Sequence, residues 1–285
     1  MIAFELAEPR TLHEAAVLID ADDPSMRAIA GGTALMLMMK TGVFQPARLV
    51  SLRGVEPRYA EISAAADGGL RIGALTTLSA LARSSQVKSA APVITRSLKT
   101  LSNVRVRNVA TLGGHLAHAD PHMDLPPVLM ALGAQIATVA PAGSRTLAVA
   151  DLYTGYYETA LARNELIAEI IVPSQHGRRA AYIKCTTRSA DDWPTLGIAV
   201  SLDVEGGVVK EACIVVSAAM EKPVRLAAAE GVLRGQTVSG AVLQRCGEAA
   251  MAEVEPVSDA RGSAAYKSEL LRVYVGRAVR AALVS

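Results

Sequence analysis

The sequence has few aromatic residues and few cysteines. One Trp, seven Tyr and two Phe occur among 285 residues, so the hydrophobic share of 51% consists mainly of Ala, Val, Leu, Ile and Met. This share, with a mean hydropathy of +0.29, excludes an intrinsically disordered chain. The three cysteines, Cys185, Cys213 and Cys246, form no C-x-x-C pair of the kind that holds zinc or an iron–sulfur cluster. We therefore expect buried free thiols in a reducing compartment.

Neither sign of charge is in excess, and long apolar runs are missing. The 29 basic residues against 27 acidic ones give a net charge of +2 without a basic block, which predicts binding neither to nucleic acid nor to a membrane surface. The most apolar stretches, 28–39 and 125–134, contain Gly or Pro and fall short of the roughly 20 residues of a spanning helix. Residues 1–5 do not resemble a signal peptide. We expect a soluble, cytoplasmic protein without membrane insertion.

The first half of the chain mixes helical and strand patterns. Thr11 and Glu14 form a capping box that predicts a helix from about residue 12. Strand 27–30 is expected to lead through the glycine pair Gly31-Gly32 into a helix over 34–40. The further elements expected up to residue 101 are strands 48–52 and 70–74, a helix ending at Arg83 and capped by Thr76 or Thr77, and a helical stretch over 92–101.

A second glycine pair, Gly113-Gly114, lies in the segment 108–115 and predicts another turn. Asp124 precedes an expected helix over 125–133, which has prolines in its first turn. A hairpin over 135–149 and a strand over 165–172 follow. Residues 173–177 have the polar, turn-rich character of a linker. Since 285 residues suit two domains, we place the domains at 1–173 and 178–285.

The second half begins with strands and ends with helices. Strands are expected over 181–187, 196–204 and 208–219, and helices from about residue 226 to the end. This order predicts an α+β domain with an antiparallel sheet and helices on one of its faces.

The two glycine pairs are the main chemical signal. Glycine turns allow backbone N–H groups to approach an anion, so two such turns can hold one diphosphate. The chain contains neither G-x-G-x-x-G nor G-x-x-x-x-G-K-[ST], which argues against a Rossmann site and a P-loop. On these residues alone, ordinary tight turns remain the stronger alternative.

The longer strings around the glycine pairs are more specific. Residues 30–35 with Met39-Lys40, and residues 111–121 with Asp124-Leu125-Pro126, resemble the FAD-binding medium subunit of the molybdenum hydroxylases, the family of xanthine dehydrogenase and carbon monoxide dehydrogenase. The resemblance extends over nearly the whole chain. It implies an FAD-binding domain of the vanillyl-alcohol-oxidase (PCMH) type followed by a smaller C-terminal α+β domain of the CO dehydrogenase flavoprotein type.

The resemblance also implies a set of cofactor contacts, and it assigns this chain no catalytic or metal-binding residue. Around the FAD diphosphate it implies Ile29, Ala30, Gly31, Gly32, Thr33, Ala34 and Leu35. Further cofactor contacts are implied for Ala110, Thr111, Gly113, Gly114, His115, Asp124, Ile167 and Lys184. Asp124 is expected to accept hydrogen bonds from cofactor hydroxyls. His115 stands where the family usually has Asn, although a neutral imidazole can also donate and accept. Lys184 is expected to favour the anionic reduced flavin.

Several of these residues have alternative explanations. Lys184 fits a solvated lysine on a strand equally simply, and Trp193 fits either a shield over the flavin or an anchor between domains. Arg105 and Arg107 alternate along a segment that we expect to be extended and solvated. A further alternative is a metal site, because imidazole and carboxylate ligands suit zinc or iron. The candidate ligands are His115, His118, Asp120 and His122.

The function that the resemblance implies is electron transfer in an oxidoreductase. Electrons would come from the [2Fe-2S] clusters of a small partner subunit, after substrate oxidation at a molybdopterin in a large partner subunit, and pass through FAD to an acceptor. The expected assembly is a heterotrimer, paired into a dimer of heterotrimers. One alternative is a self-contained flavin oxidase of the vanillyl-alcohol-oxidase type. Another is a scaffold protein that has lost the cofactor. Neither the substrate nor the acceptor can be predicted from this chain.

Overall fold

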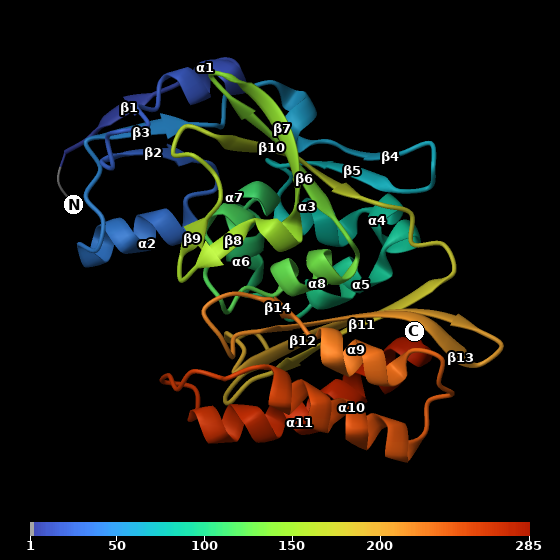
Figure 1. The fold of residues 1–285 in the computed structure, drawn as a ribbon. Coiled ribbons are helices and arrows are strands. Elements are labelled where there is room, and N and C mark those ends of the chain that lie inside the picture. Colours follow the sequence, from blue (N-terminus) through green and yellow to red (C-terminus); the bar gives the residue numbers. More distant parts are fainter. Residues whose placement is uncertain (1–2) are drawn as a thin grey trace.

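The computed structural model describes residues 3–285, and its N-terminal part contains two larger β-sheets and a two-stranded sheet of β8 and β9 (Figure 1). Of the two larger sheets, the smaller is parallel, with the order β1-β3-β2, and the other is antiparallel, with the order β4-β5-β10-β6-β7. The predicted hairpin over 135–149 forms β6 and β7, with Ala140 opposite Gly143. The strands are β1 (Glu5–Ala7), β2 (Met26–Ile29), β3 (Arg48–Ser51), β4 (Ile62–Ala64), β5 (Leu70–Gly73), β6 (Gln135–Ala140), β7 (Gly143–Ala148), β8 (Tyr153–Gly155), β9 (Glu158–Thr159) and β10 (Leu166–Val172).

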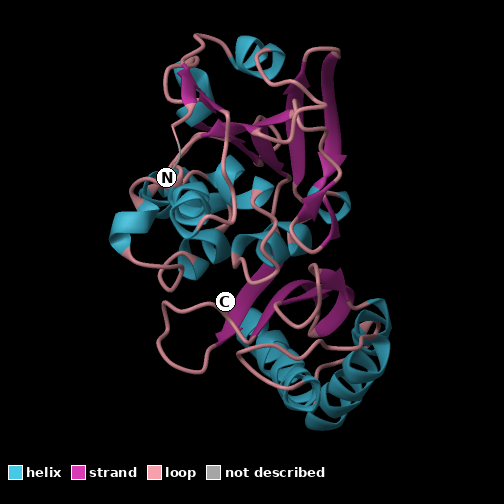
Figure 2. Ribbon diagram, turned by 90° about the vertical axis from the view of Figure 1, so that its left-hand side faces the viewer, coloured by secondary structure: helices cyan, strands magenta, loops and turns pink. Residues whose placement is uncertain are grey.

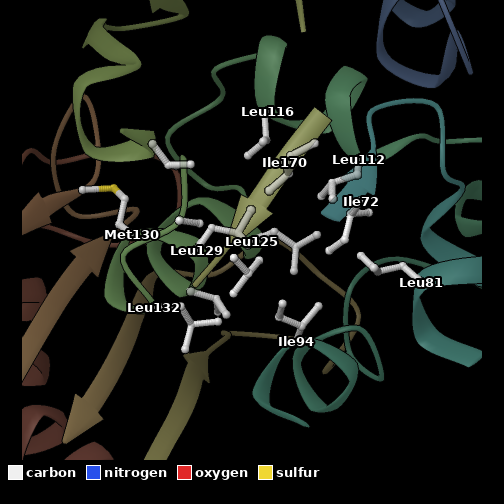
Figure 3. Packing of buried hydrophobic residues seen from close by; sticks show 14 of the residues in the cluster. Ile72, Leu81, Ile94, Leu112, Leu116, Leu125, Leu129, Met130, Leu132 and Ile170 are labelled. Atoms are coloured by element: carbon white, nitrogen blue, oxygen red, sulfur yellow. The ribbon is translucent and has the colours of Figure 1, made fainter. Parts of the chain in front are cut away.

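Short helices fill the space beside the larger sheet and form the main core with it. Leucine, isoleucine and valine side chains from β5, β10 and the helices α3, α5, α7 and α8 meet there (Figure 3). Thr77, rather than Thr76, caps α3 by accepting a hydrogen bond from the Ala80 N–H group. The helices are α1 (Leu12–Val17), α2 (Thr33–Thr41), α3 (Leu78–Arg83), α4 (Ser85–Ala90), α5 (Pro92–Ser97), α6 (Val104–Arg107), α7 (Leu112–Ala117) and α8 (Leu125–Ala131), with 3-10 turns η1 (Pro57–Ala60) and η2 (Val149–Asp151).

The C-terminal part is a four-stranded antiparallel sheet covered by helices on its outer face (Figure 2), as the order of elements predicts. Because side chains alternate along a strand, β12 places Ile198 and Val200 against these helices and Ala199 against the N-terminal part. The inner face packs on α5 and α8. The elements are β11 (Arg178–Cys185), β12 (Leu196–Glu205), β13 (Val208–Ser217), β14 (Val224–Arg225), α9 (Ala227–Leu233), α10 (Gly240–Glu253) and α11 (Ala264–Leu283).

Two local expectations are wrong. Residues 104–107 form a helical turn, α6, instead of an extended segment, because the Asn103 side chain caps the N–H group of Val106. Arg105 is exposed, whereas Arg107 donates to backbone carbonyl oxygens. The second glycine pair lies inside α7 rather than in a turn, since Thr111 caps that helix through the Gly114 N–H group.

The three cysteines are free thiols that are buried or half-buried. Cys185 and Cys246 are buried and Cys213 is half-buried, and all three are free thiols. Burial raises the pKa of each thiol, to about 11 for Cys185 and Cys213 and to about 12 for Cys246.

Within residues 3–285, none of the helices combines the length and the apolar character needed to cross a bilayer.

Candidate cofactor-binding site

The first glycine pair forms the turn between β2 and α2. Gly32 has a φ of +68°, a left-handed conformation that favours glycine, and it is the N-cap residue of α2. No side chain caps this helix, whereas Thr111 and Asn103 cap α7 and α6. The first N–H groups of α2 therefore lack a side-chain partner at the positive end of the helix dipole. This arrangement suits a phosphate group.

The second glycine string packs directly against the first. A Cβ atom on Gly31 would lie 2.1 Å from the carbonyl oxygen of Val109 and 2.8 Å from the Cα atom of Ala110. A Cβ atom on Gly114 would lie 4.0 Å from the Cβ atom of Ala30. The two strings, which are about 80 residues apart in sequence, therefore meet in one place, and glycine permits the close approach of their backbones.

The second string differs from an anion-binding turn in how its N–H groups are used. The Gly113 N–H group donates to the Ala74 carbonyl oxygen at 2.7 Å, and that of Gly114 donates to Thr111 Oγ1 at 3.2 Å. A Cβ atom on Gly113 would lie 2.6 Å from Ala74 Cβ. The prediction that both pairs offer free N–H groups to a diphosphate is therefore wrong for the second pair. Gly113 instead permits close packing against Ala74.

Ile167 lies next to a bulge in β10, close to the second string. The pairing between β10 and β6 shifts register between Ile167 and Glu169. The Ala74 N–H group donates to the carbonyl oxygen of Ala168 at 2.9 Å, and the carbonyl oxygen of Ala74 accepts from the Gly113 N–H group. These two hydrogen bonds fix the backbone beside Ile167 relative to α7.

Lys184 and Asp124 form a buried ion pair between the two parts of the chain. Lys184 Nζ lies 3.1 Å from Asp124 Oδ2, and each side chain is only 6% exposed. The ammonium also donates to the Thr100 carbonyl oxygen at 2.8 Å, and the Tyr182 hydroxyl donates to Asp124 Oδ1 at 2.7 Å. Burial raises the pKa of the Asp124 carboxyl, while the neighbouring ammonium opposes that shift. Lys184 is therefore not a solvated strand lysine.

Tyr182 is a residue that the sequence reasoning missed. It lies two positions before Lys184 in β11, and residues two apart in a strand share a face. Because side chains alternate along a strand, the assignment of Lys184 to the site also predicts that Tyr182 points towards it.

His115 is buried without a partner for one of its ring nitrogens. Its side chain lies in α7, and Nε2 has no hydrogen-bond partner among residues 3–285. Burial lowers the pKa of the imidazole to about 3, and the positive charge of Lys184 adds to this effect. His115 is thus a neutral ring with an unpartnered nitrogen within the second string.

This low pKa predicts a pH-dependent stability. Because the folded-state pKa lies below the unfolded value of 6.5, the contribution of neutral His115 is complete above pH 6.5 and is lost as the pH falls towards 3. Between pH 7 and pH 5 the loss amounts to about 2 kcal/mol. The free energy of unfolding in urea should be measured at both pH values for the unchanged protein and for His115→Asn. Between pH 7 and pH 5, the variant should lose about 2 kcal/mol less than the unchanged protein. Equal losses would contradict the assignment of a neutral, buried ring.

The histidine-rich motif after α7 forms a network of charges rather than a convergent ligand set. His122 Nδ1 lies 3.0 Å from Asp120 Oδ1, and His122 Nε2 lies 3.0 Å from Asp259 Oδ2. Lys267, which is 1% exposed, donates to Asp259 at 2.8 Å. In the described part of the chain, no three His, Cys, Asp or Glu side chains are arranged to hold a metal ion. The network instead ties the segment after α7 to α11.

Trp193 lies on the same network. Its ring stacks on that of His122 with centroids 5.9 Å apart and an interplanar angle of 12°, and Arg261 lies over it at 5.0 Å. The indole therefore contacts both parts of the chain, which favours the alternative of an anchor between domains.

The residues present fit a cofactor that carries a diphosphate. The α2 turn offers N–H groups without a side-chain cap, the second string lies against that turn at Gly31, and His115 of the second string has an unpartnered polar nitrogen. Together they provide an anion-binding end and a polar, buried end within one site.

Comparison with known proteins agrees with this geometry. Residues 2–175 match the family model described as "FAD binding domain in molybdopterin dehydrogenase". Residues 181–282 match the model described as "CO dehydrogenase flavoprotein C-terminal domain".

Individual relatives match over nearly their whole length. The chain is 32% identical to the carbon monoxide dehydrogenase medium chain of Hydrogenophaga pseudoflava, over 98% of this chain and 96% of that one. It is 28% identical to the glyceraldehyde dehydrogenase medium chain of Sulfolobus acidocaldarius, over 97% of each. The solved carbon monoxide dehydrogenase from Hydrogenophaga pseudoflava superposes with a TM-score of 0.95 at 33% identity, covering 100% of this chain and 99% of that one. The chain therefore belongs to the family of FAD-binding medium subunits of the molybdenum hydroxylases, an oxidoreductase family.

Proposed function

We propose that this chain binds FAD non-covalently and passes electrons from the [2Fe-2S] clusters of a partner subunit to an external acceptor. The observation that carries the proposal is the convergence of the uncapped α2 turn with the second glycine string. A bound flavin would supply the exchange between one-electron and two-electron chemistry. The residues of this chain bind it, orient it and exclude water from it.

Each candidate residue has a role in this proposal. Residues 29–35 hold the diphosphate, because their turn offers the free N–H groups. Residues 110–115 pack behind the cofactor, and His115 offers its free nitrogen. Asp124 and Lys184 place a buried pair of opposite charges at the junction of the domains 1–173 and 178–285. Ile167 supplies a buried apolar side chain next to the bulge in β10.

The proposal extends to the assembly. The relatives are named medium chains, and the solved carbon monoxide dehydrogenase is a form that lacks the Mo-pyranopterin moiety of the molybdenum cofactor. By analogy, we propose a large molybdopterin subunit and a small [2Fe-2S] subunit as partners, paired into a dimer of heterotrimers. A cytoplasmic location stays a prediction.

The experiment is to purify the chain after expression without partners and to measure its flavin and its activity. The proposal predicts yellow protein with one FAD per chain, released by denaturation, and no substrate turnover by the chain alone. Turnover by the isolated chain would support the self-contained oxidase instead. A colourless protein that takes up no added FAD would support a scaffold.

A further inference from the structure

A groove lies between α10 and α11 in the C-terminal part of the chain. Its volume is about 390 Å³, and small-molecule sites in proteins usually have volumes of about 300–1,000 Å³. Figure 1 shows both helices on the side of the C-terminal sheet that faces away from the N-terminal part. The groove is therefore separate from the candidate cofactor site, and we call it the α10–α11 groove.

Two glycines leave the space for this groove. Elsewhere along the two helices, Gly247 is required by packing, because a Cβ atom there would lie 2.0 Å from the carbonyl oxygen of Arg272. Gly240 and Gly276 line the groove. A Cβ atom on Gly240 would have no atom within 4 Å beyond its chain neighbours and its own helix backbone, and one on Gly276 would make an ordinary contact with Leu243 Cβ at 3.4 Å. Since glycine is unfavourable within a helix and packing requires neither residue, their effect is to keep the groove open.

Three arginines and no acidic residue line the α10–α11 groove. All three, Arg272, Arg277 and Arg280, belong to α11. Arg272 is paired with Glu269 at 2.8 Å. Arg277 and Arg280 are exposed, and within residues 3–285 neither has a carboxylate partner. Because residues three apart in a helix are neighbours on its surface, two unpaired guanidinium groups lie side by side on the wall of the groove.

The groove also offers an ordered cation and an apolar surface. The guanidinium carbon of Arg277 lies 4.5 Å from the centroid of the Tyr274 ring, a cation–π contact. This contact restricts the arginine before a ligand binds, so binding loses less side-chain entropy. Val273, which is 38% exposed, and the buried Leu243 line the groove as well. A ligand there would meet both positive charge and apolar side chains.

We infer that the α10–α11 groove binds an organic phosphate of about nucleotide size, in which a phosphate monoester is attached to an apolar or aromatic group. A phosphate monoester carries a charge of about −1.5 to −2 at pH 7, which matches the two unpaired guanidinium groups, whereas a carboxylate carries only one negative charge. Guanidinium groups also bind phosphate oxygens in pairs. Val273 and Leu243 would contact the organic part. The inference goes beyond the proposed function and does not depend on it.

The test is the binding of AMP to the full chain, measured by isothermal titration calorimetry in the presence of saturating FAD. FAD keeps AMP out of the candidate cofactor site. AMP carries a phosphate monoester on a body of suitable size, while adenosine lacks the phosphate and inorganic phosphate lacks the body. A chain that takes up no FAD would contradict the proposed function, and the AMP titration would still test the groove.

One pair of variants tests the charges. Arg277→Gln with Arg280→Gln removes the two unpaired guanidinium groups from the groove. Arg234→Gln with Arg245→Gln removes the same charge from two exposed residues that do not line it. Because both double variants change the net charge equally, a difference between them reports on the groove itself.

A second pair of variants tests the space and leaves every charge in place. Gly240→Leu places a side chain in the groove, and leucine is a better helix former than glycine. Gly231→Leu is the matched control on α9, because an added Cβ there also has no atom within 4 Å beyond its chain neighbours and its own helix backbone. Urea unfolding should show that all the variants remain folded.

AMP is expected to bind at one site per chain, with adenosine and inorganic phosphate binding at least about tenfold more weakly. The groove arginine variant and Gly240→Leu should each weaken AMP binding at least about tenfold, while both controls keep it. Absence of saturable AMP binding would overturn the inference. Equal AMP affinities in the two arginine variants, or in Gly240→Leu and Gly231→Leu, would overturn it as well.

Discussion

Replacing Lys184 with methionine is expected to lower the free energy of unfolding by about 3–5 kcal/mol, the usual effect of removing one partner of a buried ion pair. The Asp124 carboxylate would keep the Tyr182 hydroxyl as a donor but would lose the ammonium at 3.1 Å. The carbonyl oxygen of Thr100 would also lose its donor. Urea unfolding of the unchanged and variant proteins measures the difference.

A lysine in the same sheet provides the control. Lys210 on β13 has a side chain that is 50% exposed and pairs with Glu205 at the surface. Because exposed pairs contribute about 0–1 kcal/mol, Lys210→Met should change stability little. The double variant Lys184→Met with Asp124→Asn removes the unpaired charge and should recover part of the loss. If Lys184→Met has no larger effect than Lys210→Met, the buried pair does not exist in solution.

The same variant also reports on the cofactor. If Lys184 lies beside the flavin, losing its positive charge disfavours the anionic reduced form and lowers the flavin midpoint potential. The Lys210→Met protein should keep its potential. A large loss of stability with an unchanged midpoint potential would support the buried ion pair of Lys184 with Asp124. It would also show that Lys184 does not lie beside the flavin.

Replacing Gly31 with valine is expected to abolish FAD binding and to destabilise the chain. The new Cβ atom would lie 2.1 Å from the carbonyl oxygen of Val109, and backbone atoms cannot move away as the end of a side chain can. Overpacking of this kind typically costs about 1–3 kcal/mol or more. The two glycine strings would be pushed apart. Fluorescence titration with FAD and urea unfolding should both show the loss, and normal binding would show that the strings do not meet.

Gly114 allows the cofactor site to be tested with less effect on the fold. A Cβ atom there meets only Thr111 Oγ1, at 3.0 Å, before reaching Ala30 at 4.0 Å. Gly114→Val should therefore fold but bind FAD at least about tenfold more weakly, a change of about 1.4 kcal/mol. Gly231→Val is the matched control, because an added Cβ on this helical glycine would have no atom within 4 Å beyond its chain neighbours and its own helix backbone. Equal FAD affinity in both variants would remove Gly114 from the site.

Much of the fold could be predicted from local patterns. The capping residue Thr11, the turn at Gly31-Gly32 and the order of strands before helices in the second half each specify their elements through short-range physics. The incorrect predictions fall in segments where a single polar side chain caps a helix and outweighs the secondary-structure preferences of the neighbouring residues. Asn103 and Thr111 each cap a helix in segments that glycine and valine would otherwise make extended or irregular.

The contacts within the candidate site could not be predicted from the sequence. The family resemblance identifies Asp124 and Lys184 separately, while their ion pair depends on how the inner face of the C-terminal sheet packs on α8. The network of His122, Asp259 and Lys267 joins residues that lie far apart in sequence, so no local pattern could reveal it. Such contacts follow from tertiary packing alone.

We propose that this chain is the flavin-bearing electron-transfer subunit of a larger assembly. The most direct measurement is to purify the tagged chain from its source cells and to determine FAD, iron and molybdenum across a single size-exclusion peak. All three are expected to elute together in a fixed ratio, and substrate is expected to reduce the flavin only in this assembly. A homogeneous monomer that carries FAD without either metal, and that oxidises substrate by itself, would contradict it.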